Sequence, residues 1–133
     1  MNTYKSKYGR LHGTSYPELV RAARREYHLI EKRNPRRLAY VRSKYFKGEK
    51  IFLDQFWTHL NQKNLGDKER RIALYVCAID LMRHTTHAPE VIIENKAKFY
   101  RFQGKTKEGQ VFYVQILENT TSKRKDFISV FPG

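Results

Sequence analysis

The sequence has few of the residues that define several common protein classes. Cysteine occurs once in the 133 residues, at Cys77, which excludes an intramolecular disulfide and the usual zinc site built from several thiolates. It contains no run of about 18 apolar residues, so we expect no transmembrane helix. The first residues lack the apolar core of a signal peptide. These absences favour a protein of the reducing cytoplasm that holds no metal ion and no other cofactor.

Acidic residues are also scarce. The chain has 13 Asp and Glu residues against 27 Lys and Arg, a net charge of +14, and residues 1–50 hold 14 of the basic residues but only four acidic ones. This excess favours a polyanionic partner. We therefore predict that the protein binds nucleic acid, RNA in preference to DNA. The basic N-terminal segment lacks the clean apolar face of a membrane-bound helix, so we predict no membrane partner. The alternative to nucleic-acid binding is that this segment is a solvated basic helix that only confers solubility.

Aromatic residues are interleaved with the basic ones in the first 50 residues. Such rings stack on bases while Lys and Arg hold phosphates. A solvated helix face is an equally good interpretation for the basic residues that lie beyond residue 60. The predicted nucleic-acid-binding residues are Arg33, Arg36, Arg37, Arg42, Lys44, Tyr45, Lys63, Arg70, Arg71 and Tyr113.

The hydrophobic pattern changes its period along the chain. Helical spacing predicts helices near residues 16–33, 51–63 and 68–83, after a flexible arm over residues 1–15. Period-two alternation then predicts strands at 98–103, 110–118 and 125–131, and 91–94 is a candidate edge strand. The predicted fold is α+β, with N-terminal helices packed on one face of a small three- to four-stranded antiparallel sheet. Residues 1–37 would be a basic arm and helix appended to a domain of residues 38–133.

The alternate positions of the predicted strands differ in chemistry. One set is uniformly apolar, includes Ile128 and Val130, and is expected to face the helices. The other set brings Arg101, Gln115 and Ser129 to mid-strand, where we expect them side by side across the sheet. The same set holds Phe99, Phe127 and Phe131. A cation, hydrogen-bonding groups and rings suit a phosphate and an unstacked nucleotide. An exposed face covered by the N-terminal helix is the alternative.

RNA cleavage without a metal ion is a reaction that suits this face. It requires a base for the 2′-hydroxyl group, an acid for the 5′-oxygen and cations for the charge on phosphorus. We predict that Arg101 clamps the phosphate, because a guanidinium binds two of its oxygens. His59 is the preferred acid or base, with His84 and His87 as alternatives and Tyr113 ranked below them. The predicted catalytic set is Arg101, His59, Gln115, Ser129 and Glu118.

The C-terminal half of the sequence resembles a known family. Residues 101–109, 112–116 and 127–132 are similar to parts of the phage- and mobile-element-associated nucleases grouped as barnase–EndoU–colicin–RelE-like, and residues 40–46 and 56–64 extend the similarity. The resemblance covers residues 38–133 or thereabouts. It implies helices packed on a four-stranded antiparallel sheet and RNA cleavage without a metal ion. It also implies that Arg101, Gln115 and Ser129 lie on the active face.

The residues and the resemblance together predict a metal-independent endoribonuclease, toxin-like or carried by a mobile element. The basic N-terminal segment would hold RNA, and the sheet face would cut it. One alternative is a non-catalytic nucleic-acid-binding protein with the same fold. Another is a protein–protein interaction module whose Phe-rich face is covered by an acidic neutralising protein.

Overall fold

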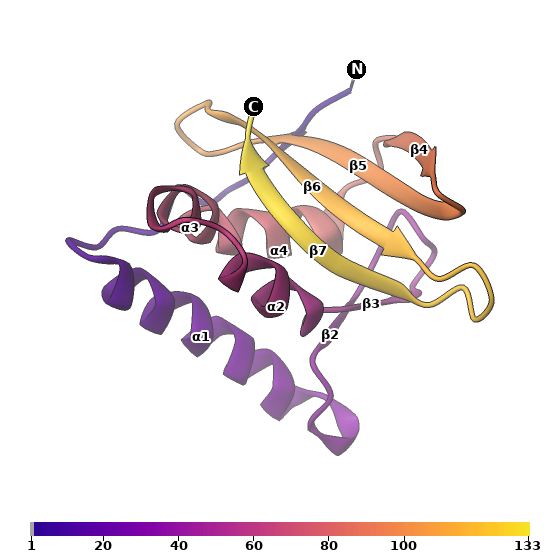
Figure 1. Ribbon diagram of the computed structural model, residues 1–133, viewed down its shortest axis with the longest axis horizontal. Coiled ribbons are helices and arrows are strands. Elements are labelled where there is room, and N and C mark those ends of the chain that lie inside the picture. The colour runs from indigo at the N-terminus through magenta and orange to yellow at the C-terminus, as the bar shows by residue number, and fades with distance from the viewer. Residues whose placement is uncertain (1) are drawn as a thin grey trace.

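The computed structural model describes residues 2–133, which form helices on one side of a curled sheet (Figure 1). The helices are α1 (Tyr16–Arg33), the 3-10 turn η1 (Pro35–Arg37), α2 (Gln55–Asn61), α3 (Leu65–Ile72) and α4 (Tyr75–His84). The strands are β1 (Tyr4–Lys5), β2 (Tyr40–Arg42), β3 (Lys50–Phe52), β4 (Glu90–Glu94), β5 (Ala97–Lys105), β6 (Val111–Glu118) and β7 (Lys125–Pro132).

The sheet is larger and more mixed than the sequence predicts. Within the described residues it has seven strands in the order β1-β5-β6-β7-β3-β2, with β4 also paired to β5. Pairing is antiparallel along β4, β5, β6 and β7, but β1 pairs with β5 and β3 with β7 in parallel. The predicted small antiparallel sheet is therefore wrong. The additional strands β1, β2 and β3 have only two or three residues each, too few for a period-two pattern to show.

The helices form two layers rather than one. In the inner layer, α2 and α3 pack on β7 while α4 packs on β6, and α1 lies outside them against α3 and α4 (Figure 1). The prediction that the N-terminal helices cover the sheet is therefore wrong for α1. Its buried residues Leu19, Ala23, Tyr27 and Ile30 recur every three or four positions, as one helix face requires. They join the same hydrophobic cluster as the inner helices; the division at residue 37 stays a prediction.

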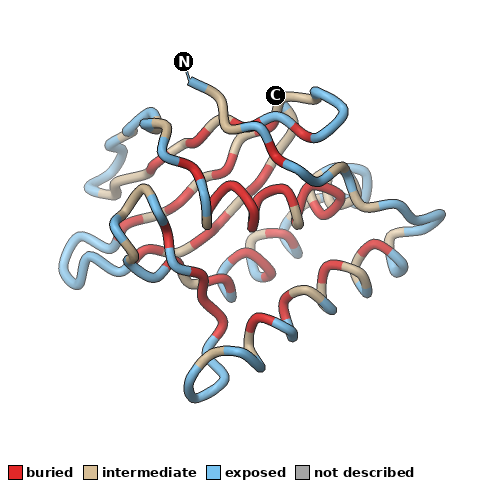
Figure 2. Tube along the Cα trace, turned by 180° about the vertical axis from the view of Figure 1, so that it is seen from behind, coloured by how far each residue is buried: buried red, intermediate tan, exposed pale blue. Residues whose placement is uncertain are grey.

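The predicted helix over residues 68–83 is two helices in the structure. The chain turns at Ala73 and Leu74, between α3 and α4. Residues 72–75 are all almost completely buried. In α4, Cys77–Met82 are buried as well. Successive side chains of a helix point in different directions around its axis, so this helix must be enclosed on several sides, and it contacts β6, β2 and α1. Figure 2 shows an almost continuous buried stretch along α4.

The N-terminal arm is partly ordered by the sheet. Tyr4 and Lys5 pair with Gly104 and Lys105 at the edge of β5, which corrects the prediction of a flexible arm there. Separately, no helix among residues 2–133 is long and apolar enough to cross a membrane.

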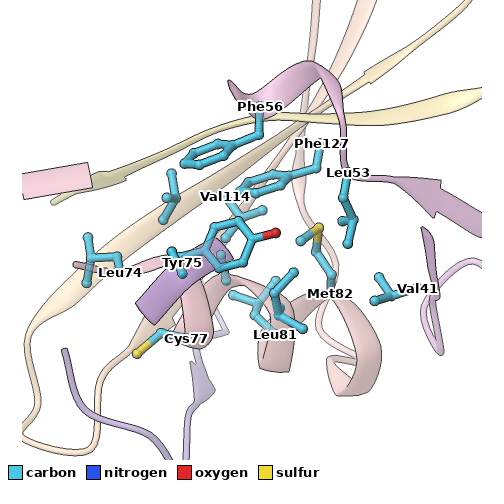
Figure 3. Packing of buried hydrophobic residues seen from close by; sticks show 14 of the residues in the cluster. Val41, Leu53, Phe56, Leu74, Tyr75, Cys77, Leu81, Met82, Val114 and Phe127 are labelled. Carbon is cyan, nitrogen blue, oxygen red and sulfur yellow. The ribbon is translucent and has the colours of Figure 1, made fainter. Parts of the chain in front are cut away.

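A β-bulge changes which residues of β7 face the core. Gln115 pairs with Ser129, but the next residue, Ile116, pairs with Phe127, so Ile128 is the extra residue. Beyond the bulge the side-chain parity reverses. Phe127 is therefore fully buried, not exposed on the other face as the alternation predicts. Its ring stacks on Phe56 at a centroid distance of 4.7 Å and an angle of 4° (Figure 3).

Candidate functional site

The face of β5, β6 and β7 that points away from the helices carries a polar row at its centre. Arg101 lies directly opposite Gln115, and Gln115 opposite Ser129. The Nη2 group of Arg101 donates a hydrogen bond to Oε1 of Gln115 over 3.3 Å. All three side chains are partly exposed. We call the surface formed by this row together with Tyr113 and Phe131 the outer face.

A second guanidinium reaches the outer face from the helical layer. Arg71 of α3 donates from Nη1 to Oγ of Ser129 over 2.5 Å, and its Nε lies 3.2 Å from Oδ2 of Asp67. Its Cζ lies 5.5 Å from the centre of the Phe131 ring, and the Cζ of Arg101 lies 5.7 Å from the same centre. Two cations therefore converge on one ring. The sequence predicts Arg71 as a nucleic-acid-binding residue, but not its place beside Ser129, because only tertiary packing brings α3 there.

Two aromatic rings extend the outer face. Tyr113 lies opposite Phe131 in the register, with the ring centres 5.6 Å apart and inclined at 35°. Both residues are partly exposed. In the described part of the chain Arg101 forms no ion pair, and its Nε is buried without a hydrogen-bond partner. The outer face thus combines stacking surface with guanidinium charge that the protein leaves available, which suits an aromatic, anionic ligand.

Glu118 does not join the row. It lies at the end of β6 with its side chain on the core side, nearly buried. Tyr100 donates to its Oε1 over 3.0 Å and the ammonium of Lys125 lies 3.2 Å from the same atom. Burial alone would raise the pKa of Glu118, but these two hydrogen bonds outweigh burial and hold its pKa below the usual value. Glu118 is therefore an ionised structural residue in this environment.

The histidines also lie away from the row. His59 belongs to the last turn of α2 in the helical layer and is half-buried. His84 ends α4, and its Nε2 lies 3.9 Å from Oδ1 of Asp80. His87 follows in the loop after α4. The structure thus assembles Arg101, Gln115, Ser129, Arg71 and Tyr113 from the predicted residues, and leaves His59 and Glu118 elsewhere.

The other predicted binding residues are dispersed over the helical side. Tyr45 differs from the rest because its ring packs against the core. Its ring centre lies 5.4 Å from that of Phe102 and 5.0 Å from that of Phe46. Arg36 and Arg37 both adopt positive φ, at 57° and 52°. The remaining positions are Arg33 at the end of α1, Arg42 in β2, Lys44 in the turn after β2, Lys63 after α2 and Arg70 in α3.

Asp80 is a buried polar residue that the sequence does not single out as important. Its side chain is 2% exposed, and its Oδ2 accepts hydrogen bonds from Tyr4 Oη (3.0 Å), Ser6 Oγ (2.9 Å) and the Lys7 amide (3.3 Å). Burial and the bond to Asp80 together raise the pKa of Tyr4. A single carboxylate thus fixes the N-terminal arm. The signal in the sequence is an acid within the apolar run Tyr75–Met82 of α4.

Cys77 and the acidic residues offer little for other chemistry. The thiol donates weakly to the carbonyl groups of Tyr8 and Gly9, and burial raises its pKa to about 11, so it stays protonated at neutral pH. Among residues 2–133, no group of three or more His, Cys, Asp or Glu side chains is placed to hold a metal ion.

Comparison of the chain with protein-family models, with curated proteins and with solved structures gave no match.

Proposed function

We propose that this protein is a metal-independent endoribonuclease that binds single-stranded RNA across its outer face. The observation that carries the proposal is the convergence of Arg71 and Arg101 on Phe131, beside Tyr113. A nucleic acid offers a phosphate for each guanidinium and a base for the rings. The net charge of +14 favours the same partner.

RNA cleavage of this kind needs few protein groups, since the substrate supplies its own nucleophile. The 2′-oxygen bonds to phosphorus as its proton leaves to a base, and the bond to the 5′-oxygen breaks as that oxygen takes up a proton. The products are a 2′,3′-cyclic phosphate and a 5′-hydroxyl end. Arg101 and Arg71 would stabilise the charge that grows on the phosphate oxygens. Tyr113 is the group of the outer face with a hydroxyl suited to move a proton.

Further parts of the proposal rest on the sequence. We keep the resemblance to barnase–EndoU–colicin–RelE-like nucleases as part of the proposal, together with a toxin-like role. We also propose an acidic neutralising partner, because its charge would complement the basic surface. We place the activity in the cytoplasm, because a single cysteine is typical of proteins from reducing compartments.

A non-catalytic RNA-binding protein is the second candidate. The observation in its favour is that His59 and Glu118 lie away from the outer face. Without them, the outer face and Arg71 supply guanidinium groups, an amide and hydroxyl groups, which bind a phosphate well but include no carboxylate or imidazole to act as a general base.

Cleavage of a labelled RNA pool in EDTA separates these two candidates. We compare the wild type with Arg101→Ala and with Arg21→Ala, which removes the same charge from the exposed side of α1. The endoribonuclease proposal expects 2′,3′-cyclic ends, and a rate at least about 100-fold lower in Arg101→Ala only, the usual effect of losing one group that stabilises the developing charge.

The remaining outcomes are equally informative. Absence of cleavage by the wild type, with RNA binding that is lost in Arg101→Ala, selects the non-catalytic protein. Cleavage or binding that is equal in both variants overturns the assignment of the outer face. Thermal unfolding of each variant verifies that it is folded.

A further inference from the structure

A second basic surface lies on the helical side of the sheet, away from the outer face. Two hollows of about 200 Å³ and 350 Å³ adjoin each other there, and Ile30, Arg33, Arg83 and His84 line both. Because they share these four residues, we treat them as one groove. The N-terminal arm, α1, β2 and α4 form its walls.

Basic side chains outnumber acidic ones in the lining of this groove. The basic residues are Lys7, Arg33, Arg42 and Arg83, and the acidic ones are Glu26 and Asp80. None of the four basic side chains forms an ion pair within residues 2–133. The groove therefore has an excess of positive charge that no ion pair among the described residues neutralises, although Glu26 and Asp80 also line it.

The carboxylate of Asp80 is already engaged. Its Oδ2 accepts the three hydrogen bonds from the N-terminal arm, and its Oδ1 faces His84 Nε2 at 3.9 Å. These bonds hold Lys7 and Tyr8 of the arm in the lining. The groove is consequently formed before any ligand arrives, which reduces the entropy cost of binding. The imidazole of His84 is 56% exposed and is accessible as a further donor.

Arg83 supplies the second, independent indication of a ligand. Its Nε is buried and has no hydrogen-bond partner among the described residues. A guanidinium with a donor left unpaired favours an anionic oxygen as a ligand, because charge-assisted hydrogen bonds are stronger than neutral ones. Arg83 lines both hollows, so an anion that binds there meets its guanidinium at the centre of the groove.

We infer that this groove binds a phosphate-bearing ligand, at a site separate from the outer face. Arg33, Arg83 and Arg42 hold the phosphate oxygens, and His84 adds a hydrogen bond. The shared chemistry is that of a free nucleotide or pyrophosphate and of the backbone of a nucleic acid. The inference does not depend on cleavage at the outer face.

The His84 ring gives a direct readout of the groove, because its NMR signals respond to a ligand beside it. We would titrate the protein with pyrophosphate and, separately, with a single-stranded pentauridylate. The variants are Arg83→Gln and Arg33→Gln; Arg33 is exposed at the end of α1, so its loss leaves the fold intact. Arg21→Gln is the matched control, with the same change on the same helix outside the groove.

We expect a saturable shift of the His84 signals in the wild type, in Arg21→Gln and in Arg101→Ala. The affinity should fall about tenfold or more in Arg83→Gln and in Arg33→Gln, as the loss of a charged hydrogen bond implies. Tighter binding of pyrophosphate identifies a free phosphate ligand, and tighter binding of pentauridylate identifies a nucleic-acid backbone. A shift that does not saturate with either probe, or that is unchanged in Arg33→Gln, overturns the inference.

Discussion

The buried Lys125 lies between two carboxylates, the nearly buried Glu118 and the exposed Glu49. The Lys125 side chain is 5% exposed, with its ammonium 3.2 Å from Oε1 of Glu118 and 2.5 Å from Oε2 of Glu49. Burial alone would lower the pKa of Lys125, but its hydrogen bonds to the two carboxylates outweigh burial and raise its pKa. Lys125 and Glu118 are therefore both charged at neutral pH. A charge at such a site is costly once it loses its partner.

We expect Glu118→Gln to lower the free energy of unfolding by about 1–3 kcal/mol at neutral pH, because it weakens a buried hydrogen bond to a charged group. Folding lowers the pKa of Glu118 below the usual 4.5. Its charge therefore stabilises the native state above that usual value, and this stability is lost as the pH falls through the lower folded pKa. Urea unfolding at neutral and acidic pH measures the difference between variant and wild type, which should shrink in acid.

Glu94→Gln is the control for this prediction. Glu94 is exposed at the end of β4, so its loss should change the stability by no more than about 0.5 kcal/mol. An equal loss of stability in Glu118→Gln at neutral and acidic pH would contradict the role given to its charge.

At the scale of elements, β7 shows what alternation can and cannot predict. The period-two alternation correctly puts Arg101, Gln115 and Ser129 on one face, where the strand register brings them side by side. The alternation assigns Phe127 to the wrong face, because the bulge inserts Ile128 as an extra residue and no residue type in the sequence indicates a bulge there. Alternation and helical spacing predict α1, β5, β6 and β7, because each of these elements repeats its pattern several times, but they miss the break between α3 and α4. They also miss the two- and three-residue strands, because pairing with distant segments defines those strands.

The bulge leads to a prediction about two phenylalanines of the same strand. We expect Phe127→Ala to cost about 3–5 kcal/mol of stability, because its buried ring stacks on Phe56. Phe131→Ala, on the outer face, should cost no more than about 1 kcal/mol. It should instead weaken RNA binding about tenfold or more, as the loss of one stacked base implies. Urea unfolding and fluorescence anisotropy with labelled RNA measure the two effects.

Each of these variants is the control for the other. The prediction fails if Phe131→Ala destabilises the protein as much as Phe127→Ala does. It also fails if Phe131→Ala leaves RNA affinity unchanged, since the ring would then not touch the ligand.

At the scale of the whole molecule, the fold uses buried carboxylates to fix its own parts and leaves guanidinium groups available. Asp80 holds the N-terminal arm, and Glu118 pairs with Lys125. Arg101 on the outer face and Arg83 in the groove have no such partner among residues 2–133. The sequence predicts the total charge but not this distribution, because it depends on which acids the tertiary structure buries. Specific contacts and net charge therefore make different predictions for RNA binding.

The salt dependence of RNA affinity distinguishes specific phosphate contacts from a response to net charge. RNA affinity should fall linearly with salt on logarithmic axes, with a slope of about −0.7 for each phosphate contact to a single strand. Arg101→Ala should reduce the magnitude of this slope by about 0.7, because it removes one contact. Arg21→Ala removes the same net charge from a position outside both surfaces and should leave the slope unchanged. Anisotropy titrations with a short labelled RNA at several salt concentrations measure the slopes. If both variants changed the slope equally, RNA would respond to the total charge of the molecule and not to the outer face.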